Sequence, residues 1–115
     1  MHAATAELLG VSASAIQQLG WNLDAVPERM QPVLRFARKL TQQPSSVTKA
    51  DADTVLAAGW DETALYHAIA VTALFNLMNR LVEGGGIQLD PAYVKPASER
   101  LAKRGYLPLI ALFTK

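Results

Sequence analysis

The chain has 115 residues, of which 50% are hydrophobic and 18% are charged. This length fits a single domain, and soluble domains usually have about a quarter of their residues charged, so we expect part of the apolar surface to contact another subunit. The net charge of +1 gives no reason to expect a nucleic acid or an anionic membrane as a partner. The absence of cysteine excludes disulfides, thiolate nucleophiles and zinc-thiolate sites within the chain.

The sequence has no recognisable targeting or membrane segment. Its N-terminus lacks the basic flank and continuous apolar run of a signal peptide. No segment reaches the roughly 18 uninterrupted apolar residues of a membrane span. We therefore expect a cytoplasmic protein that does not bind a membrane.

Helices separated by glycine and proline are predicted along the whole chain, which indicates an all-α fold with one helical domain over residues 1–115. Residues 3–9 predict a short helix that ends at Gly10. Ser12 is a suitable cap for a second short helix over residues 13–19. Together the two predict a helical hairpin.

An amphipathic helix is predicted within residues 27–43, because apolar side chains recur there at intervals of three and four. Thr41 falls in the same row as these apolar residues. Pro32 lies inside the segment, so the helix either begins near Gln31 or bends at the proline.

Two further helices follow, separated by a glycine. Thr48 and Asp51 have the spacing of a capping box at the start of a helix that runs to Gly59. We expect Trp60 to pack over this break. Asp61 then caps the longest predicted helix, residues 62–83.

The segment beyond the triple glycine at 84–86 is predicted to be less regular. It contains two turn or cap pairs, Asp90-Pro91 and Lys95-Pro96. A short polar helix is predicted over residues 98–104. The apolar tail at 106–113 would need a groove to lie in.

A narrow polar stripe interrupts the otherwise apolar helix at 62–83. Residues at intervals of three and four form this polar stripe: Thr72, Asn76, Asn79, Arg80 and Glu83. A buried amide without a partner costs about 1 to 3 kcal/mol, so we expect the two asparagines to bond to backbone ends, to one another or to a facing helix. We interpret Arg80 as a structural clamp that closes a helix end or pairs with Glu83, in preference to a ligand-binding residue.

The order of several short motifs resembles that of the peroxidase-related branch of the carboxymuconolactone decarboxylase and alkylhydroperoxidase D superfamily. The resemblance covers about residues 33–87. It is carried by a Lys-Leu-Thr turn, a Pro-x-x-Val-Thr connector, an Ala-Gly-Trp break and an FNxxNR stretch, at 39–41, 44–48, 58–60 and 75–80. The resemblance implies a compact helical bundle of the alkylhydroperoxidase D-like type, which associates as a homodimer or larger ring, and a peroxidase-like oxidoreductase activity.

The chemistry of that family resides in a Cys-x-x-Cys-x-x-x-His motif with an assisting glutamate, where two thiols cycle between dithiol and disulfide. This chain has no cysteine, but its first residues, MHAATAELLG, look like the stretch just past the family's cysteines. The resemblance therefore implies that His2 corresponds to the motif histidine and that the chain lacks the catalytic segment before it. The alternative is that His2 is a frayed terminal residue.

The remaining candidates for a site are weak. His67 lies on an apolar row of the long helix, which favours a hydrogen-bonded core residue over a ligand, and no second ligand stands at metal spacing from it. The triple glycine follows a helix, so it indicates a chain reversal and not a phosphate-binding loop. We expect neither a metal nor a cofactor.

Three classes of function remain. The first is a peroxidase-like redox enzyme, or a remnant of one that is inactive without its cysteines. The second is a non-catalytic helical protein that forms homo-oligomers. The third is a helix-turn-helix DNA-binding module around Gly59. Its recognition helix would begin with Asp61 and Glu62, whose charges repel phosphate, and would continue with apolar residues, which cannot hydrogen-bond to base edges.

Overall fold

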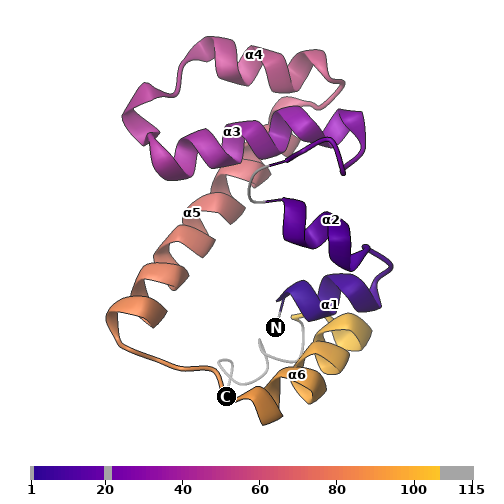
Figure 1. The fold of residues 1–115 in the computed structure, drawn as a ribbon. Coiled ribbons are helices and arrows are strands. Elements are labelled where there is room, and N and C mark those ends of the chain that lie inside the picture. The colour runs from indigo at the N-terminus through magenta and orange to yellow at the C-terminus, as the bar shows by residue number, and fades with distance from the viewer. Residues whose placement is uncertain (1, 20–21, 107–115) are drawn as a thin grey trace. The chain divides into compact units, whose positions relative to one another are not determined.

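The structure is a computed structural model that describes residues 2–19 and 22–106. These residues form six α-helices and two short 3-10 helices without any strand, so the all-α prediction is confirmed. The chain divides into two units: a terminal unit, Met1–Trp21 with Gln88–Lys115, and a central unit, Asn22–Ile87 (Figure 1). That residues 1–115 form a single domain stays a prediction.

The central unit begins with a 3-10 turn, η1 (Glu28–Met30), that leads into α3 (Gln31–Gln42). The helix therefore starts near Gln31, the first of the two alternatives at Pro32. Proline fits there because a residue in the first turn of a helix has no intrahelical acceptor for its N–H.

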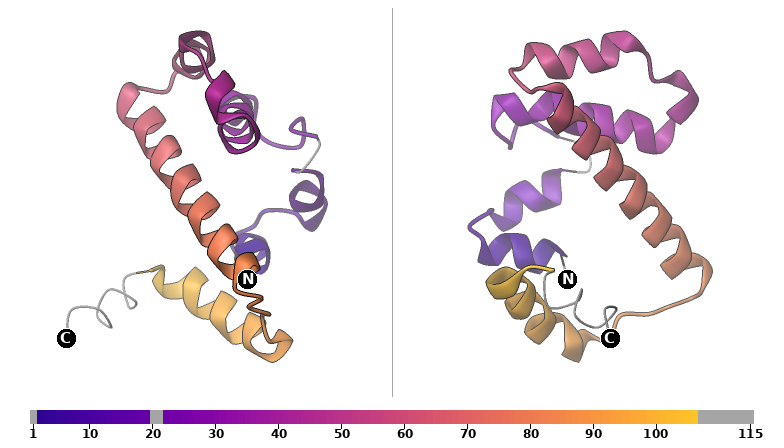
Figure 2. Two further views of the ribbon diagram at one scale, coloured as in Figure 1. Left: turned by 90° about the vertical axis from the view of Figure 1, so that its left-hand side faces the viewer. Right: turned by 180° about the vertical axis from the view of Figure 1, so that it is seen from behind.

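A second 3-10 turn, η2 (Pro44–Ser46), reverses the chain so that α4 (Lys49–Ala57) lies beside α3 (Figures 1 and 2). The buried apolar side chains of the central unit are Leu23, Phe36 and Val55. Phe36 comes from α3 and Val55 from α4, so the two helices share one small core.

The predicted capping box at Thr48 also joins the two helices. The Asp51 carboxylate accepts hydrogen bonds from the Thr48 backbone N–H and hydroxyl, at 2.7 and 2.9 Å. It also forms an ion pair with the Lys39 ammonium of α3, with N to O distances of 2.7 and 2.8 Å. The hydrogen bond from Lys39, followed by those from Thr48, lowers the pKa of Asp51 from 3.8 to about 2.

We predict that Asp51→Asn destabilises the protein at neutral pH and that its effect disappears in acid. Because the folded-state pKa lies below the unfolded value, the carboxylate stabilises the fold above about pH 4, and this contribution is lost as pH falls through about pH 2. Urea unfolding of both proteins at several pH values measures the difference. A constant difference between pH 7 and pH 2 would contradict the ion-pair assignment. Asp53→Asn, which removes an exposed pair with Lys49 within α4, is the control.

Trp60, which follows the break between α4 and the next helix, packs on Arg29 of η1. The Arg29 guanidinium lies 4.2 Å from the centre of the Trp60 ring and donates a 2.7 Å hydrogen bond to the Gly59 carbonyl. The Trp60 indole N–H donates in turn to the Arg29 carbonyl, at 2.9 Å. Gly59 has a φ of 87°, a backbone conformation that favours glycine, and this turn lets the chain reverse beside η1.

The longest helix, α5 (Glu62–Gly84), agrees closely with the predicted helix at 62–83. Its cap is Asp61, whose carboxylate accepts a 2.7 Å hydrogen bond from the Ala64 N–H, as predicted. It packs against α3 and, more briefly, α4, and Figure 1 shows that its C-terminal end continues beyond both helices. None of its residues is buried.

The terminal unit consists of α1 (His2–Leu8), α2 (Ala13–Gln18) and α6 (Pro91–Arg104). Ser12 caps α2 by accepting from the Ala15 N–H at 3.1 Å, as predicted. Its buried residues are small, and they come from all three helices: Thr5, Ala15, Ala97 and Ser98. Small side chains allow α1 and α6 to pack closely.

Helix α6 is longer than predicted. Asp90 caps it, with a 2.9 Å hydrogen bond from the Ala92 N–H, and Pro91 occupies its first turn. The interpretation of Lys95-Pro96 as a turn or cap pair is wrong, because the helix continues through Pro96. The φ of proline is compatible with a helix, and burial of the next two residues against the rest of the unit offsets the lost N–H bond. The predicted apolar tail lies outside the described residues, apart from Tyr106.

Within the described ranges, no helix combines the length and apolar character needed to cross a membrane.

Candidate functional site

The polar stripe of α5 faces α3. Thr72 and Asn76 are half-buried, and the Asn76 amide N–H donates a 3.0 Å hydrogen bond to the hydroxyl oxygen of Thr41 on α3. The Thr41 hydroxyl donates onward to the Ala37 carbonyl at 2.8 Å. Thr72 donates to the Ala68 carbonyl of its own helix at 2.7 Å. Thr41 is not identified as a partner by residue spacing, although its place in the apolar row of α3 indicates that it faces a neighbour.

The C-terminal part of the stripe is exposed. Arg80 donates a 2.8 Å hydrogen bond to the Asn76 backbone carbonyl, one turn earlier in the same helix. The suggested ion pair between Arg80 and Glu83 is not among those of the described residues. In this structure Arg80 therefore contacts its own helix and does not link two helices.

A shallow groove of about 420 Å³ runs between α3 and α5. Its polar lining includes Arg38, Thr41, Gln42, Asn76 and Asn79, and its apolar lining includes Leu34 and Phe75. These groups offer amide and hydroxyl hydrogen bonds and one cation. No carboxylate or imidazole lines the groove, so its lining has no pair for general acid and base catalysis.

His2 belongs to the terminal unit, at the start of α1. Its imidazole Nε2 lies 2.6 Å from the Tyr106 hydroxyl, just beyond the end of α6, and both side chains are exposed. No local pattern predicts this contact, because its two residues are 104 positions apart. His2 is therefore held in α1 and is bonded to α6 through Tyr106.

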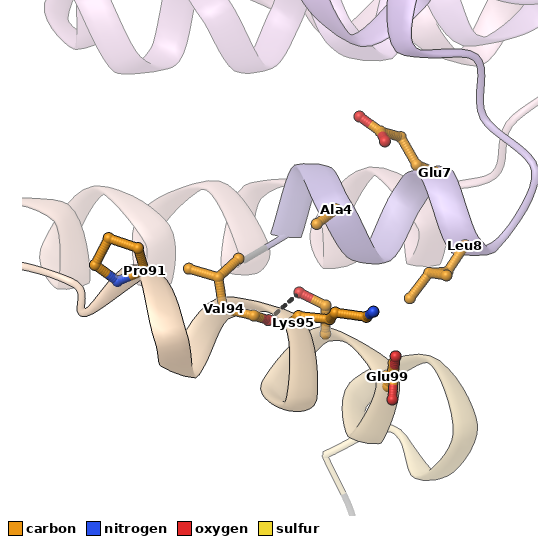
Figure 3. Close-up of a pocket in the computed structure, with 8 residues that line it drawn as sticks. Ala4, Glu7, Leu8, Pro91, Val94, Lys95 and Glu99 are labelled. Carbon is orange, nitrogen blue, oxygen red and sulfur yellow. Dashed lines mark hydrogen bonds between the residues drawn. The ribbon is translucent and has the colours of Figure 1, made fainter.

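A second shallow pocket, of about 350 Å³, lies between α1 and α6 (Figure 3). Ala4, Glu7 and Leu8 line it from α1, and Val94, Lys95 and Glu99 are among its residues from α6. Both helices contribute charged and apolar groups to its lining. His2 is not among the residues that line it.

His67 is exposed on α5, so its interpretation as a core histidine is wrong. The reason is that the apolar row on which it lies does not face the core. No group of three or more residues suited to a metal occurs in the described part of the chain.

Many apolar side chains of α5 are exposed. One row of them, which we call the outer row, consists of Val71, Leu74, Met78 and Leu81, which are exposed by 55%, 57%, 46% and 57%. Val71 lies at the edge of this row and also lines the groove against α3, together with Thr72, Phe75 and Asn76. The side of α5 toward α3 therefore mixes polar and apolar groups, whereas the outer row is apolar and exposed, unlike the outer face of an ordinary surface helix.

Comparisons with known proteins find no matching family model, no matching curated protein and no matching solved structure.

We predict that the hydrogen bond between Asn76 and Thr41 couples α5 to α3. A double-mutant cycle of Asn76→Ala and Thr41→Val should give a coupling free energy of about 0.5 to 1 kcal/mol in urea unfolding. Asn79→Ala combined with Thr41→Val is the matched control, and its two effects should add. Equal coupling in both cycles would contradict the assigned contact.

Proposed function

We propose that this chain is the helical, oligomer-forming part of an alkylhydroperoxidase D-like protein, and that it has no thiol peroxidase activity by itself. Support for the family comes from the order of motifs between residues 33 and 87. Support for the lack of activity comes from the absence of cysteine, because the dithiol chemistry of that family needs two thiols.

The contacts of the motif residues fit this proposal. Lys39 of the Lys-Leu-Thr turn pairs with Asp51, just after the Pro-x-x-Val-Thr connector. Trp60 of the Ala-Gly-Trp break stacks on Arg29, and Asn76 of the FNxxNR stretch bonds to Thr41. Three of the four motifs thus supply a contact between elements of the central unit, which gives them a role in packing that needs no catalysis.

The outward apolar side of α5 is the observation that carries the proposal of an oligomer. A monomer seldom exposes a continuous apolar patch larger than a few hundred Å². On α5 such a patch extends over more than two helical turns, from Val71 to Leu81. Association of copies into a homodimer or larger ring would cover it.

The proposal assigns His2 to the place of the family's motif histidine. In that family the histidine relays protons for the cysteine pair. In this chain the His2 imidazole contacts Tyr106 and has no thiol of the chain to serve. His2 then occupies the place of the family's motif histidine but does not carry out its proton relay.

We predict that the purified chain consumes hydroperoxide with dithiothreitol no faster than dithiothreitol alone. The physical reason is that no residue of the chain can form the disulfide that closes the cycle. A His2→Ala variant should give the same background rate. Sustained turnover that depends on dithiothreitol and is lost in His2→Ala would contradict the proposal.

We also predict that the chain has a molar mass of at least two copies at micromolar concentration. Light scattering after size exclusion, or sedimentation equilibrium, measures it against the 12.4 kDa of one copy. The mass should fall on dilution if the association is reversible. A mass of one copy at every concentration would rule out the oligomer.

A further inference from the structure

We infer that the outer row of α5, Val71, Leu74, Met78 and Leu81, is the surface on which α5 of a second copy packs. The inference rests on the oligomer proposed above and names the surface and the partner. It follows from the spacing, charge and area of this helix face.

The spacing of the outer row is that of a helix-to-helix contact. Its residues follow one another at intervals of three, four and three, the spacing of core positions in a pair of packed helices. Leu77, 55% exposed, flanks the row on the side away from the groove between α3 and α5, which Phe75 lines. The row and Leu77 together form a face that a second helix can contact.

The charges of α5 favour another protein surface over lipid. Residues 63–79 contain no Asp, Glu, Lys or Arg, and the charged residues Glu62, Arg80 and Glu83 stand near the two ends. A helix that lies on a membrane surface normally carries several lysines or arginines on its polar face, whereas α5 has one arginine. Packing against an identical helix would desolvate no charged group in the row.

The area of the face suits a weak, reversible dimer. Half-exposed apolar side chains of this size each present on the order of 100 Å². The four residues of the outer row with Leu77 thus offer at most roughly 500 Å² per copy, or about 1,000 Å² in a pair, which is the size of a weak or transient interface.

The first test is Leu74→Glu in the full chain, with Leu89→Glu as the matched control. Leu89 is a leucine of similar exposure, 52%, and lies outside α5. Two glutamates facing each other in an apolar contact should raise the dissociation constant by about 100-fold or more, whereas the control should leave it unchanged. Sedimentation equilibrium measures both, and circular dichroism checks that both variants are helical.

The second test uses the absence of cysteine. Leu74→Cys and Leu89→Cys each introduce a single thiol, and a short bis-maleimide should join two copies through position 74 but not through position 89. If Leu74→Glu does not fold, the cross-linking result alone decides whether the outer row contacts a second copy.

The outcomes separate this inference from the proposed function. An oligomer that persists in Leu74→Glu, with no cross-link through position 74, would overturn the inference and leave the oligomer standing. A wild-type chain that is monomeric at every concentration would overturn both. A monomer in which Leu74→Glu lowers the melting temperature would show that another part of the same chain covers the row, which also overturns the inference.

Discussion

The hydrogen bond from Asn76 to Thr41 lies on the side of α5 that faces α3, and the account of this protein depends on that orientation. With the amide directed at α3, Thr72, Asn76 and Asn79 of the polar stripe lie in the groove between the two helices, beside Val71 and Phe75. Leu74, Met78 and Leu81 are exposed. The chain therefore combines a modest polar contact inside the central unit with apolar side chains on its surface.

The other contacts of the central unit support the same arrangement. The ion pair between Lys39 and Asp51 holds α4 beside α3. The reciprocal bonds of Arg29 with Gly59 and Trp60 hold the turn that precedes α5. Neither contact involves a residue of the outer row.

Local signals in the sequence were sufficient for three of the helix starts. Ser12, Thr48 and Asp61 each precede a helix and cap it through interactions within about four residues, which is why residue type and spacing predict them. Contacts across the chain had no such signal: Trp60 was expected to pack over its break, but not on Arg29, and Tyr106 was not expected near His2. Helix α6 was predicted too short because a proline inside a helix usually ends it. In the structure the helix continues through Pro96, and the next two residues, Ala97 and Ser98, are buried. The periodicity of α5 revealed its two sides, but not which side faces the neighbour, since that depends on Thr41 in another helix.

The orientation of α5 is tested most directly by the reactivity of single thiols on its two sides. In Thr72→Cys the thiol faces α3, and in Leu74→Cys it belongs to the outer row. The rate of maleimide labelling should be low for position 72 at every protein concentration, and for position 74 it should be high in dilute solution and fall as copies associate. Faster labelling at position 72 than at position 74 in dilute solution would contradict the account.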